Sequence, residues 1–172
     1  LVGMVDGDFG LHVADFRSSE KAYQLINQVA GRAGRADKPG KILIQTFNAN
    51  HSVYEAIRSG DMKKFLDLEI ISRQENDLPP FSRFAAAIVS GTNAKLTEET
   101  AKKIAKIPPK TMKLFGPAPA PMFRLRGRTR WRILLSSQKQ INLSELIRQW
   151  TLKQTIPKNI KIQIDIDPIN FS

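Results

Sequence analysis

The segment Leu78-Pro79-Pro80-Phe81 constrains the folding of this 172-residue chain more than any other part of its sequence. Proline lacks a backbone N–H, fixes φ and pushes the residue before it away from the helical conformation, so no helix continues through two consecutive prolines. We therefore expect one structural unit over residues 1–78 and a second over residues 79–172. The chain is long enough for two small domains.

The two parts differ in charge. Residues 1–78 hold 10 Lys and Arg and 11 Asp and Glu, a net charge of −1, whereas residues 79–172 hold 17 and 5, a net charge of +12. An excess of this size indicates a polyanionic partner, most often nucleic acid. A merely basic, soluble surface is the alternative. An anionic membrane surface is less favoured, because no basic amphipathic helix with a large aromatic face is present.

The composition excludes several classes of site. The chain has no cysteine, which excludes disulfides, thiolate-bound zinc and a cysteine nucleophile. The two histidines, His12 and His51, are too few for most metal sites, and we expect none. No apolar stretch approaches the roughly 20 residues that span a bilayer, so no membrane partner is expected.

Hydrophobic patterning predicts an α/β unit followed by an α+β domain. In the first part, buried strands are expected at 1–5 and 41–47 and helices at 19–33, 51–60 and 62–76. In the second part, strands are expected at 83–90, 113–115, 131–136 and 160–166 and helices at 94–106 and 141–154. The second part therefore predicts a small β-α-β-β-α-β sandwich with its helices on one face.

The most specific motif is QVAGRAGR at residues 28–35. On a helix, Gln28, Arg32 and Arg35 share one face because they are spaced by four and three residues. An amide and two guanidiniums on one face suit a phosphate chain, since the planar arginine fork makes bidentate contacts. The two glycines weaken a helix and indicate a close backbone approach or a helix end at a cleft. The alternative is a solvated arginine pair at a weakened helix end.

Five arginines occupy every second position of one basic segment: Arg124, Arg126, Arg128, Arg130 and Arg132. In an extended chain they share one face over about 26 Å, whereas a hairpin or bulge at Gly127 divides them into two groups. Either arrangement concentrates guanidiniums along a path for a phosphate backbone, and Phe123 offers a stacking surface for an unpaired base. A basic edge strand that prevents aggregation is the alternative. No motif reads base edges, so we expect binding by structure rather than by sequence.

The remaining conspicuous residues are expected to have structural roles. Asp6 and Asp8 are assigned to a turn at a strand end, Asp165 and Asp167 to charge balance, and Trp131 and Trp150 to the core.

The motif at residues 28–35 resembles motif VI (QxxGRxGR) of superfamily 2 helicases. Further segments match the PriA-type pattern, namely 15–20 (DFRSSE), 40–46 (GKILIQT), 78–81 (LPPF), 116–119 (GPAP), 130–135 (RWRILL) and 165–168 (DIDP). Together these segments cover nearly the whole chain, which resembles the C-terminal part of the PriA family of replication-restart DNA helicases.

The resemblance implies that residues 1–78 are the end of the second RecA-like helicase lobe. Gln28 would contact the nucleotide phosphates, and Arg32 and Arg35 would form the arginine-finger and phosphate-sensing pair. Residues 79–172 would bind branched and single-stranded DNA and support primosome assembly. The family also implies ATP with Mg²⁺, a zinc-binding insertion, the single-strand-binding protein and other primosome proteins as partners, and a cytoplasmic, nucleoid-associated location.

The sequence departs from the full family pattern. It contains no GxxxxGK[ST] phosphate loop, no DEAH-type box and no zinc cysteines. We therefore expect that this chain alone neither binds ATP tightly nor hydrolyses it.

Two alternatives to a motor fragment follow from the same features. One is a stand-alone module for RNA or single-stranded DNA, since a basic β-α-β-β-α-β sheet is also typical of RNA-binding domains. The absence of the usual aromatic signature disfavours it, and so does the motif at residues 28–35, which would have no purpose there. The other is a fragment that chiefly docks protein partners.

Overall fold

The computed structural model describes residues 1–12, 15–34 and 40–169. It divides into two compact units, Leu1–Asn76 and Asp77–Ser172, a boundary two residues before the one expected from the prolines. Each unit is described by itself below. Both are mixed α/β structures, and the second contains a four-stranded antiparallel sheet.

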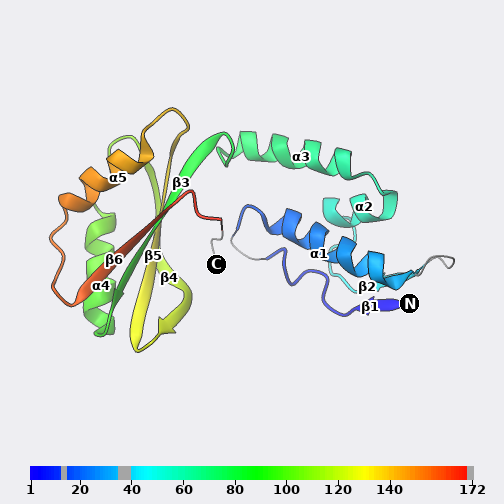
Figure 1. Cartoon of the computed structure of the whole chain (residues 1–172), viewed down its shortest axis with the longest axis horizontal. Coiled ribbons are helices and arrows are strands. Elements are labelled where there is room, and N and C mark those ends of the chain that lie inside the picture. Colours follow the sequence, from blue (N-terminus) through cyan, green and yellow to red (C-terminus); the bar gives the residue numbers. More distant parts are fainter. Residues whose placement is uncertain (13–14, 35–39, 170–172) are drawn as a thin grey trace. The chain divides into compact units, whose positions relative to one another are not determined.

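Among its described residues, the first unit contains two short strands and three helices (Figure 1). Its elements are β1 (Val2–Met4), α1 (Ser18–Ala33), β2 (Ile42–Ile44), α2 (Ser52–Ser59) and α3 (Met62–Glu75). The two strands pair in parallel, with Met4 opposite Ile44. The order strand, helix, strand, helices agrees with the α/β pattern of the sequence.

The core of the first unit lies between its helices. Ala22, Tyr23 and Ile26 form the buried face of α1, and the Tyr23 ring stacks on Phe65 of α3 with ring centroids 5.0 Å apart. The helical spacing of apolar residues also predicts Leu25 on this face, but Leu25 is 54% exposed. It follows Tyr23 by two residues and therefore points to the opposite side of the helix.

The strands of the first unit are not buried, so this prediction is wrong. Met4 and Ile44 pack against the helical core, but Leu1, Val5 and Phe47 are 81%, 79% and 100% exposed. Alternate residues of a strand point to opposite faces, and in the described part of the chain the two-stranded sheet has a core on one face only.

Side chains cap the helices that follow. The ring of His51 accepts a hydrogen bond from the Val53 amide at the start of α2, and Asp61 accepts one from the Lys64 amide at the start of α3. Gly60 ends α2 with a φ of 70°, a conformation that glycine adopts at little cost.

The second unit has the predicted β-α-β-β-α-β order. Its elements are β3 (Ser82–Gly91), α4 (Ala94–Ala105), β4 (Lys113–Leu125), β5 (Arg128–Gln138), α5 (Leu143–Leu152) and β6 (Ile160–Ile166). The strands form an antiparallel sheet in the order β4-β5-β3-β6, and α4 and α5 cover one of its faces (Figure 1). This is a ferredoxin-like sandwich, and among the described residues no helix of the second unit lies on the opposite face of the sheet.

The core of the second unit lies between that sheet and its two helices. It includes Val89 of β3, Leu135 of β5, Ile104 of α4 and Trp150 of α5. The indole of Trp150 is 5% exposed and donates a 2.7 Å hydrogen bond to the carbonyl of Ile107. Trp150 is therefore a core residue, as the sequence predicted.

Strand β4 is much longer than the three residues predicted. It continues beyond Phe115 through a proline-rich stretch to Leu125, with register shifts between Phe115 and Ala118 and between Pro119 and Arg124. β4 lies at the edge of the sheet, where a residue without an N–H is tolerated. The predicted end of this strand at Phe115 is therefore wrong, because edge position is a tertiary property that the sequence pattern does not contain.

None of the described helices combines the length and the apolar character needed to cross a membrane.

Candidate functional site

The arginine-rich segment folds as a tight hairpin. Leu125 of β4 lies opposite Arg128 of β5, and the two residues between them, Arg126 and Gly127, both have positive φ, 49° and 73°. Two consecutive residues of this kind form the type I′ turn typical of two-residue hairpins. The hairpin alternative is therefore confirmed, and a single extended ladder of five arginines is wrong.

Three of the five arginines lie on the helix-free face of the sheet. Along β5, Arg128, Arg130 and Arg132 alternate with Thr129 and Trp131, which lie on the side of the core with Ile133 and Leu135. Because successive side chains of a strand point to opposite faces, the three arginines share the face that α4 and α5 leave uncovered. We call this surface, with its residues on β3, β4 and β6, the open face.

The protein itself holds the guanidiniums of Arg128 and Arg130. Nη2 of Arg128 donates to the carbonyl oxygens of Ser90 and Asn159, at 2.8 and 3.3 Å, and Nη1 of Arg130 donates to the carbonyl oxygen of Pro121 at 3.3 Å. Both side chains are half-buried. Side chains fixed in this way lose less conformational freedom when they bind a ligand.

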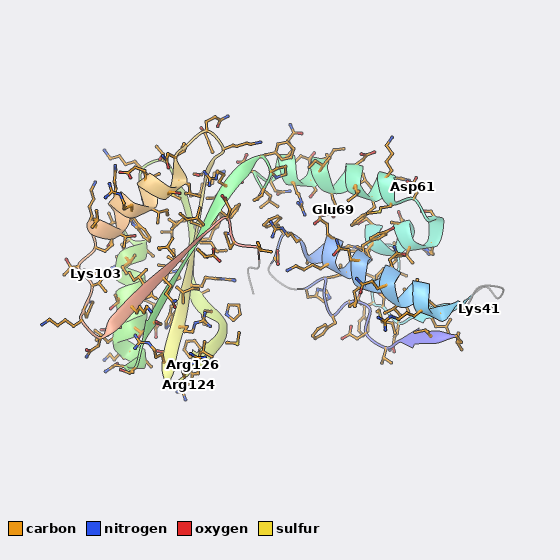
Figure 2. The ribbon with its side chains drawn as sticks, viewed as in Figure 1. Lys41, Asp61, Glu69, Lys103, Arg124 and Arg126 are labelled. Atoms are coloured by element: carbon orange, nitrogen blue, oxygen red, sulfur yellow. The ribbon has the colours of Figure 1, made fainter. Side chains whose placement is uncertain are left out.

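The other two arginines lie elsewhere on the hairpin, as Figure 2 shows near its tip. Arg124 lies opposite Thr129 and so belongs to the other face of the sheet, while Arg126 is in the turn. Both are exposed and have no hydrogen-bond or ion-pair partner among the residues described. They are available to a ligand, but not on the same surface as the three β5 arginines.

The ring of Phe123, predicted as a stacking surface for a base, packs against another aromatic side chain. Its ring packs edge-to-face on Trp131, with centroids 6.0 Å apart, and it is 38% exposed. Phe115 is an exposed aromatic ring on the open face, since it lies opposite Leu134 and is 50% exposed. Sequence reasoning missed Phe115 because its face depends on the register between β4 and β5.

Lys161 of β6 also belongs to the open face, and the sequence analysis did not single it out. Lys161 and Arg130 each lie directly opposite Ser90 of β3, one on either side. Opposite residues of antiparallel strands share a face, so the two cations are about 10 Å apart across the sheet. The alternation of residues in β6 could have predicted on which face of the strand Lys161 lies, but not which residues of other strands lie beside it.

The acidic residues of the second unit lie mostly away from this surface. Glu98, Glu99 and Glu145 are on the helices, Asp77 forms an ion pair with Lys113 at the end of the sheet far from Arg128, and Asp167 forms an ion pair with Arg83. Asp165 is on the open face, but it lies opposite Ala86, two residues along β3 beyond the level of Arg132. The charge-balancing role is thus confirmed for Asp167, and the part of the face around Arg128 and Arg130 is basic.

The helicase-like motif falls on α1 and on residues beyond it. Gln28 and Arg32 are exposed on this helix, one turn apart, on the side away from the buried face of Tyr23 and Ile26. Arg35 lies outside the described residues. An exposed amide and guanidinium one turn apart fit a nucleotide phosphate chain chemically.

Gly31 lies between these two side chains. A Cβ added there would have no heavy atom within 4 Å, so no close backbone approach occurs at this glycine within the described chain. The helix ends at Gly34, which has an extended backbone. Of the two explanations for the glycines, the structure therefore favours a helix end over close packing.

Asp8 has a structural role, because its carboxylate accepts hydrogen bonds from three other residues of the first unit. It is 4% exposed and lies in a turn after β1, as predicted. Hydrogen bonds from the Thr46 hydroxyl, the Phe47 amide and the Tyr54 phenol lower the pKa of its carboxyl. A carboxylate that already accepts three hydrogen bonds is poorly placed to act as a base.

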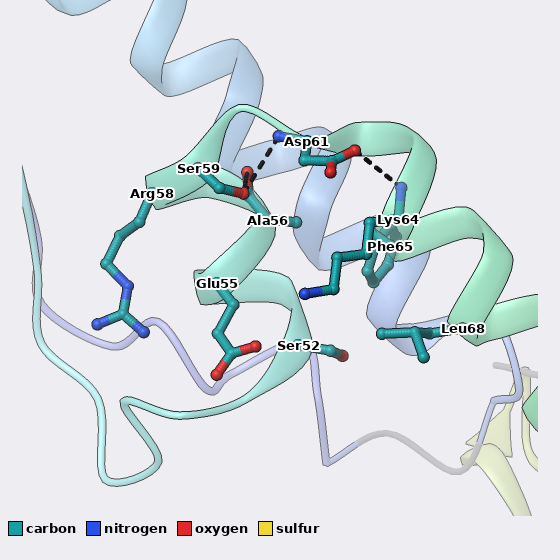
Figure 3. Close-up of a pocket in the computed structure, with 9 residues that line it drawn as sticks. All are labelled: Ser52, Glu55, Ala56, Arg58, Ser59, Asp61, Lys64, Phe65 and Leu68. Carbon is teal, nitrogen blue, oxygen red and sulfur yellow. Dashed lines mark hydrogen bonds between the residues drawn. The ribbon is translucent and has the colours of Figure 1, made fainter.

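A pocket of about 380 Å³ lies between α2 and α3 and contains none of the predicted site residues (Figure 3). Its charged residues are mixed in sign, with Glu55 and Asp61 beside Arg58 and Lys64. Asp61 uses its carboxylate to cap α3 and its amide to bond the Ser59 hydroxyl. These contacts are local helix-end structure, and the mixed charge selects no class of ligand.

Comparison with known proteins assigns the chain. Residues 74–169 match the family model of the primosomal protein N C-terminal domain. The chain is 38% identical over 172 residues to the replication restart protein PriA of Rickettsia felis, covering 99% of the chain and 26% of that relative. It is 34% identical to PriA of Synechocystis and 33% identical to PriA of Bacillus subtilis, covering 21% and 22% of those proteins.

The chain thus spans about a quarter of the length of the curated relatives it matches. The resemblance to the PriA family drawn from its motifs is confirmed, because the family model extends from the end of α3 through β6. The chain belongs to the family of the primosomal protein N C-terminal domain.

Proposed function

We propose that this chain acts in the restart of DNA replication and that its second unit binds DNA on the open face of the sheet. Its relatives are named replication restart protein PriA, which supports a role in this process. The single observation that supports the binding surface is the alignment of Arg128, Arg130 and Arg132 on the helix-free face of β5.

The character of this surface favours branched and single-stranded DNA. Guanidiniums contact phosphates whatever the base, so they position a backbone without reading sequence. The exposed ring of Phe115 on the same face offers a stacking surface that an unpaired base can reach and a base in a duplex cannot. A junction supplies both kinds of contact, duplex phosphates and unpaired bases.

We propose a motor role for the first unit in the full-length protein, as the end of a RecA-like helicase lobe. Gln28 and Arg32, with Arg35, would contact the phosphates of ATP bound with Mg²⁺, and the arginines would stabilise charge on the transferring phosphoryl group. The exposure of Gln28 and Arg32 on one side of α1 supports this assignment. Zinc would be held elsewhere in the protein, since this chain has no cysteine.

RNA binding is the second candidate function, and the fold favours it. A ferredoxin-like sheet with one uncovered face and an aromatic ring on that face is the arrangement by which some domains bind single-stranded RNA. Competition between a labelled DNA fork and unlabelled fork, single-stranded DNA and structured RNA separates the two. We expect the fork to compete best, and preferential competition by RNA would contradict the DNA assignment.

Substitutions test the surface itself. We expect Arg130→Gln with Arg132→Gln to weaken fork binding about tenfold and to lower the slope of log affinity against log salt by about 1.8 on duplex, for two lost phosphate contacts. The control is Lys103→Gln with Lys106→Gln, which removes the same charge from the end of α4, in the helix layer (Figure 2 labels Lys103). Equal binding by the two variants would overturn the assignment to the open face.

A further inference from the structure

A basic pocket lies at the edge of the open face, where β6 begins. It has a volume of about 530 Å³ and is lined by Thr92, Arg128, Lys158, Asn159, Ile160 and Lys161. Three of the six lining residues are cations and none is an acid. A concave site with this composition favours an anion, because it concentrates positive charge where a ligand loses part of its water.

Arg128 is built into this pocket and does not project freely from it. Its Nη2 is held by the carbonyl oxygens of Ser90 on β3 and Asn159 before β6, at 2.8 and 3.3 Å. Neither its Nε nor its Nη1 has a hydrogen-bond partner among the residues described. The Nε is buried, so Nη1 is the donor that this fixed guanidinium offers a ligand.

Two lysines flank Arg128 in the pocket, and their side chains are not held in place as the Arg128 guanidinium is. Lys158 and Lys161 are exposed, and neither has an ion-pair partner among the described residues. Thr92 adds a hydroxyl to the lining. Point-charge ammonium groups and a hydroxyl around an anchored guanidinium provide the donors that a phosphate group accepts.

The pocket continues into the basic path across the sheet. Lys161 lies opposite Ser90, and Arg130 lies opposite the same residue from the other side. A backbone phosphate in the pocket would therefore place the following nucleotides over Arg130 and toward Arg132. A phosphate in the pocket would define where the nucleic-acid backbone begins on the open face. The arginines of β5 alone would define only the direction in which it runs.

We propose that the pocket of Thr92, Arg128, Lys158 and Lys161 binds one phosphate group of the nucleic-acid backbone and sets the position of the strand on the open face. This inference rests on the proposed DNA-binding function of the same face. It adds two residues, Lys158 and Lys161, that neither the arginine pattern nor the family motifs singled out.

The test compares the intact chain with Lys158→Gln/Lys161→Gln, using a forked DNA whose junction fixes the position of the strand and which carries one neutral methylphosphonate at successive positions of a single-stranded arm. For the intact chain we expect one position at which the neutral linkage lowers affinity three- to tenfold. The pocket variant should bind the unmodified fork three- to tenfold more weakly and should be insensitive to that position. Lys103→Gln/Lys106→Gln is the matched control and should behave as the intact chain.

Inorganic phosphate distinguishes a nucleic-acid site from one for the free ion. Amide signals of Thr92 and Lys161 should shift with the oligonucleotide at micromolar concentrations and with phosphate only at millimolar ones. Tight binding of free phosphate that excludes the strand would overturn the proposal. Both lysines are exposed, so thermal unfolding of the pocket variant should match that of the intact chain.

The outcomes separate this proposal from the function on which it rests. If Arg130→Gln/Arg132→Gln weakens binding and the lysine variant does not, the open face stands and the pocket is refuted. If neither variant differs from the control, the DNA-binding face itself is refuted.

Discussion

The phenol of Tyr54 on α2 donates a hydrogen bond of 2.8 Å to the carboxylate of Asp8, 46 residues earlier in the chain. The same carboxylate accepts hydrogen bonds from the Thr46 hydroxyl and the Phe47 amide, both at 2.7 Å. These bonds tie the turn after β1 to the segment after β2 and to α2. A buried acid thus joins elements that the two-stranded sheet alone would hold weakly.

Tyr54→Phe should therefore destabilise the first unit by about 1 kcal/mol, the usual net value of one hydrogen bond. Urea unfolding followed by far-UV circular dichroism measures this change. Both tryptophans lie in the second unit, so their fluorescence transition should not move. Tyr23→Phe is the control, because its hydroxyl has no partner among the described residues and its ring keeps the stack on Phe65. Equal effects of the two substitutions would contradict the role of Tyr54.

Glu145 should make the second unit sensitive to acid. Two hydrogen bonds from the Arg148 guanidinium, followed by one from the Gln149 amide, lower the pKa of Glu145 to about 2. The unfolded value is about 4.3, so the contribution of this carboxylate is complete above that pH and is lost as pH falls through about 2.

Glu145→Gln should therefore flatten the loss of stability between about pH 4.5 and pH 2, measured by tryptophan fluorescence during urea unfolding. Glu99→Gln is the control, since Glu99 is exposed on α4 and has no ion pair among the described residues. An unchanged pH profile in the Glu145 variant would refute this account.

Gly31→Ala should stabilise α1 by about 0.5–1 kcal/mol, because alanine is the better helix former and a Cβ meets no atom within 4 Å. Gly127→Ala is a matched contrast. Its Cβ also meets nothing, but its φ of 73° is costly for alanine by about 1–2 kcal/mol. Thermal unfolding should rise for the first variant and fall for the second, and a fall for both would show that Gly31 is needed for packing.

The isolated chain should show no DNA-stimulated ATP hydrolysis, because its sequence lacks a phosphate loop and an acidic box. Phosphate release in the presence of forked DNA measures this directly, with a full-length relative as the positive control. In that full-length protein, replacing the arginine equivalent to Arg32 should lower turnover by at least 10³-fold, the usual scale for an arginine finger. Turnover by the isolated chain would contradict the prediction.

Local sequence patterns predicted most of the helices and strands but not which other elements pack against them. The alternation of isoleucine and polar residues defined β6 at 160–166 to the residue, whereas the apolar spacing of α1 identified Tyr23 and Ile26 as buried but wrongly included Leu25. The same kind of pattern placed residues 1–5 and 41–47 in buried strands, which they are not. Burial of a strand depends on what covers each face of its sheet, and no local pattern contains that information.

The candidate site shows the same division. Five arginines at alternate positions were plain in the sequence, and so was the possibility of a turn at Gly127. Their sorting into Arg128, Arg130 and Arg132 on one face, with Arg124 on the other, required the register of the hairpin. Lys161 and Arg130 are 31 residues apart in sequence and both lie opposite Ser90, so only the sheet order brings them together.

The sequence by itself determined the two-part division, the segregation of charge, the β-α-β-β-α-β order and the family, because these depend on local chemistry and residue spacing. The tertiary structure alone decided which cations share a surface and that a pocket joins Arg128 to Lys158 and Lys161. Charge is a property of residues, whereas a binding surface depends on strand register and on the face that the helices leave uncovered.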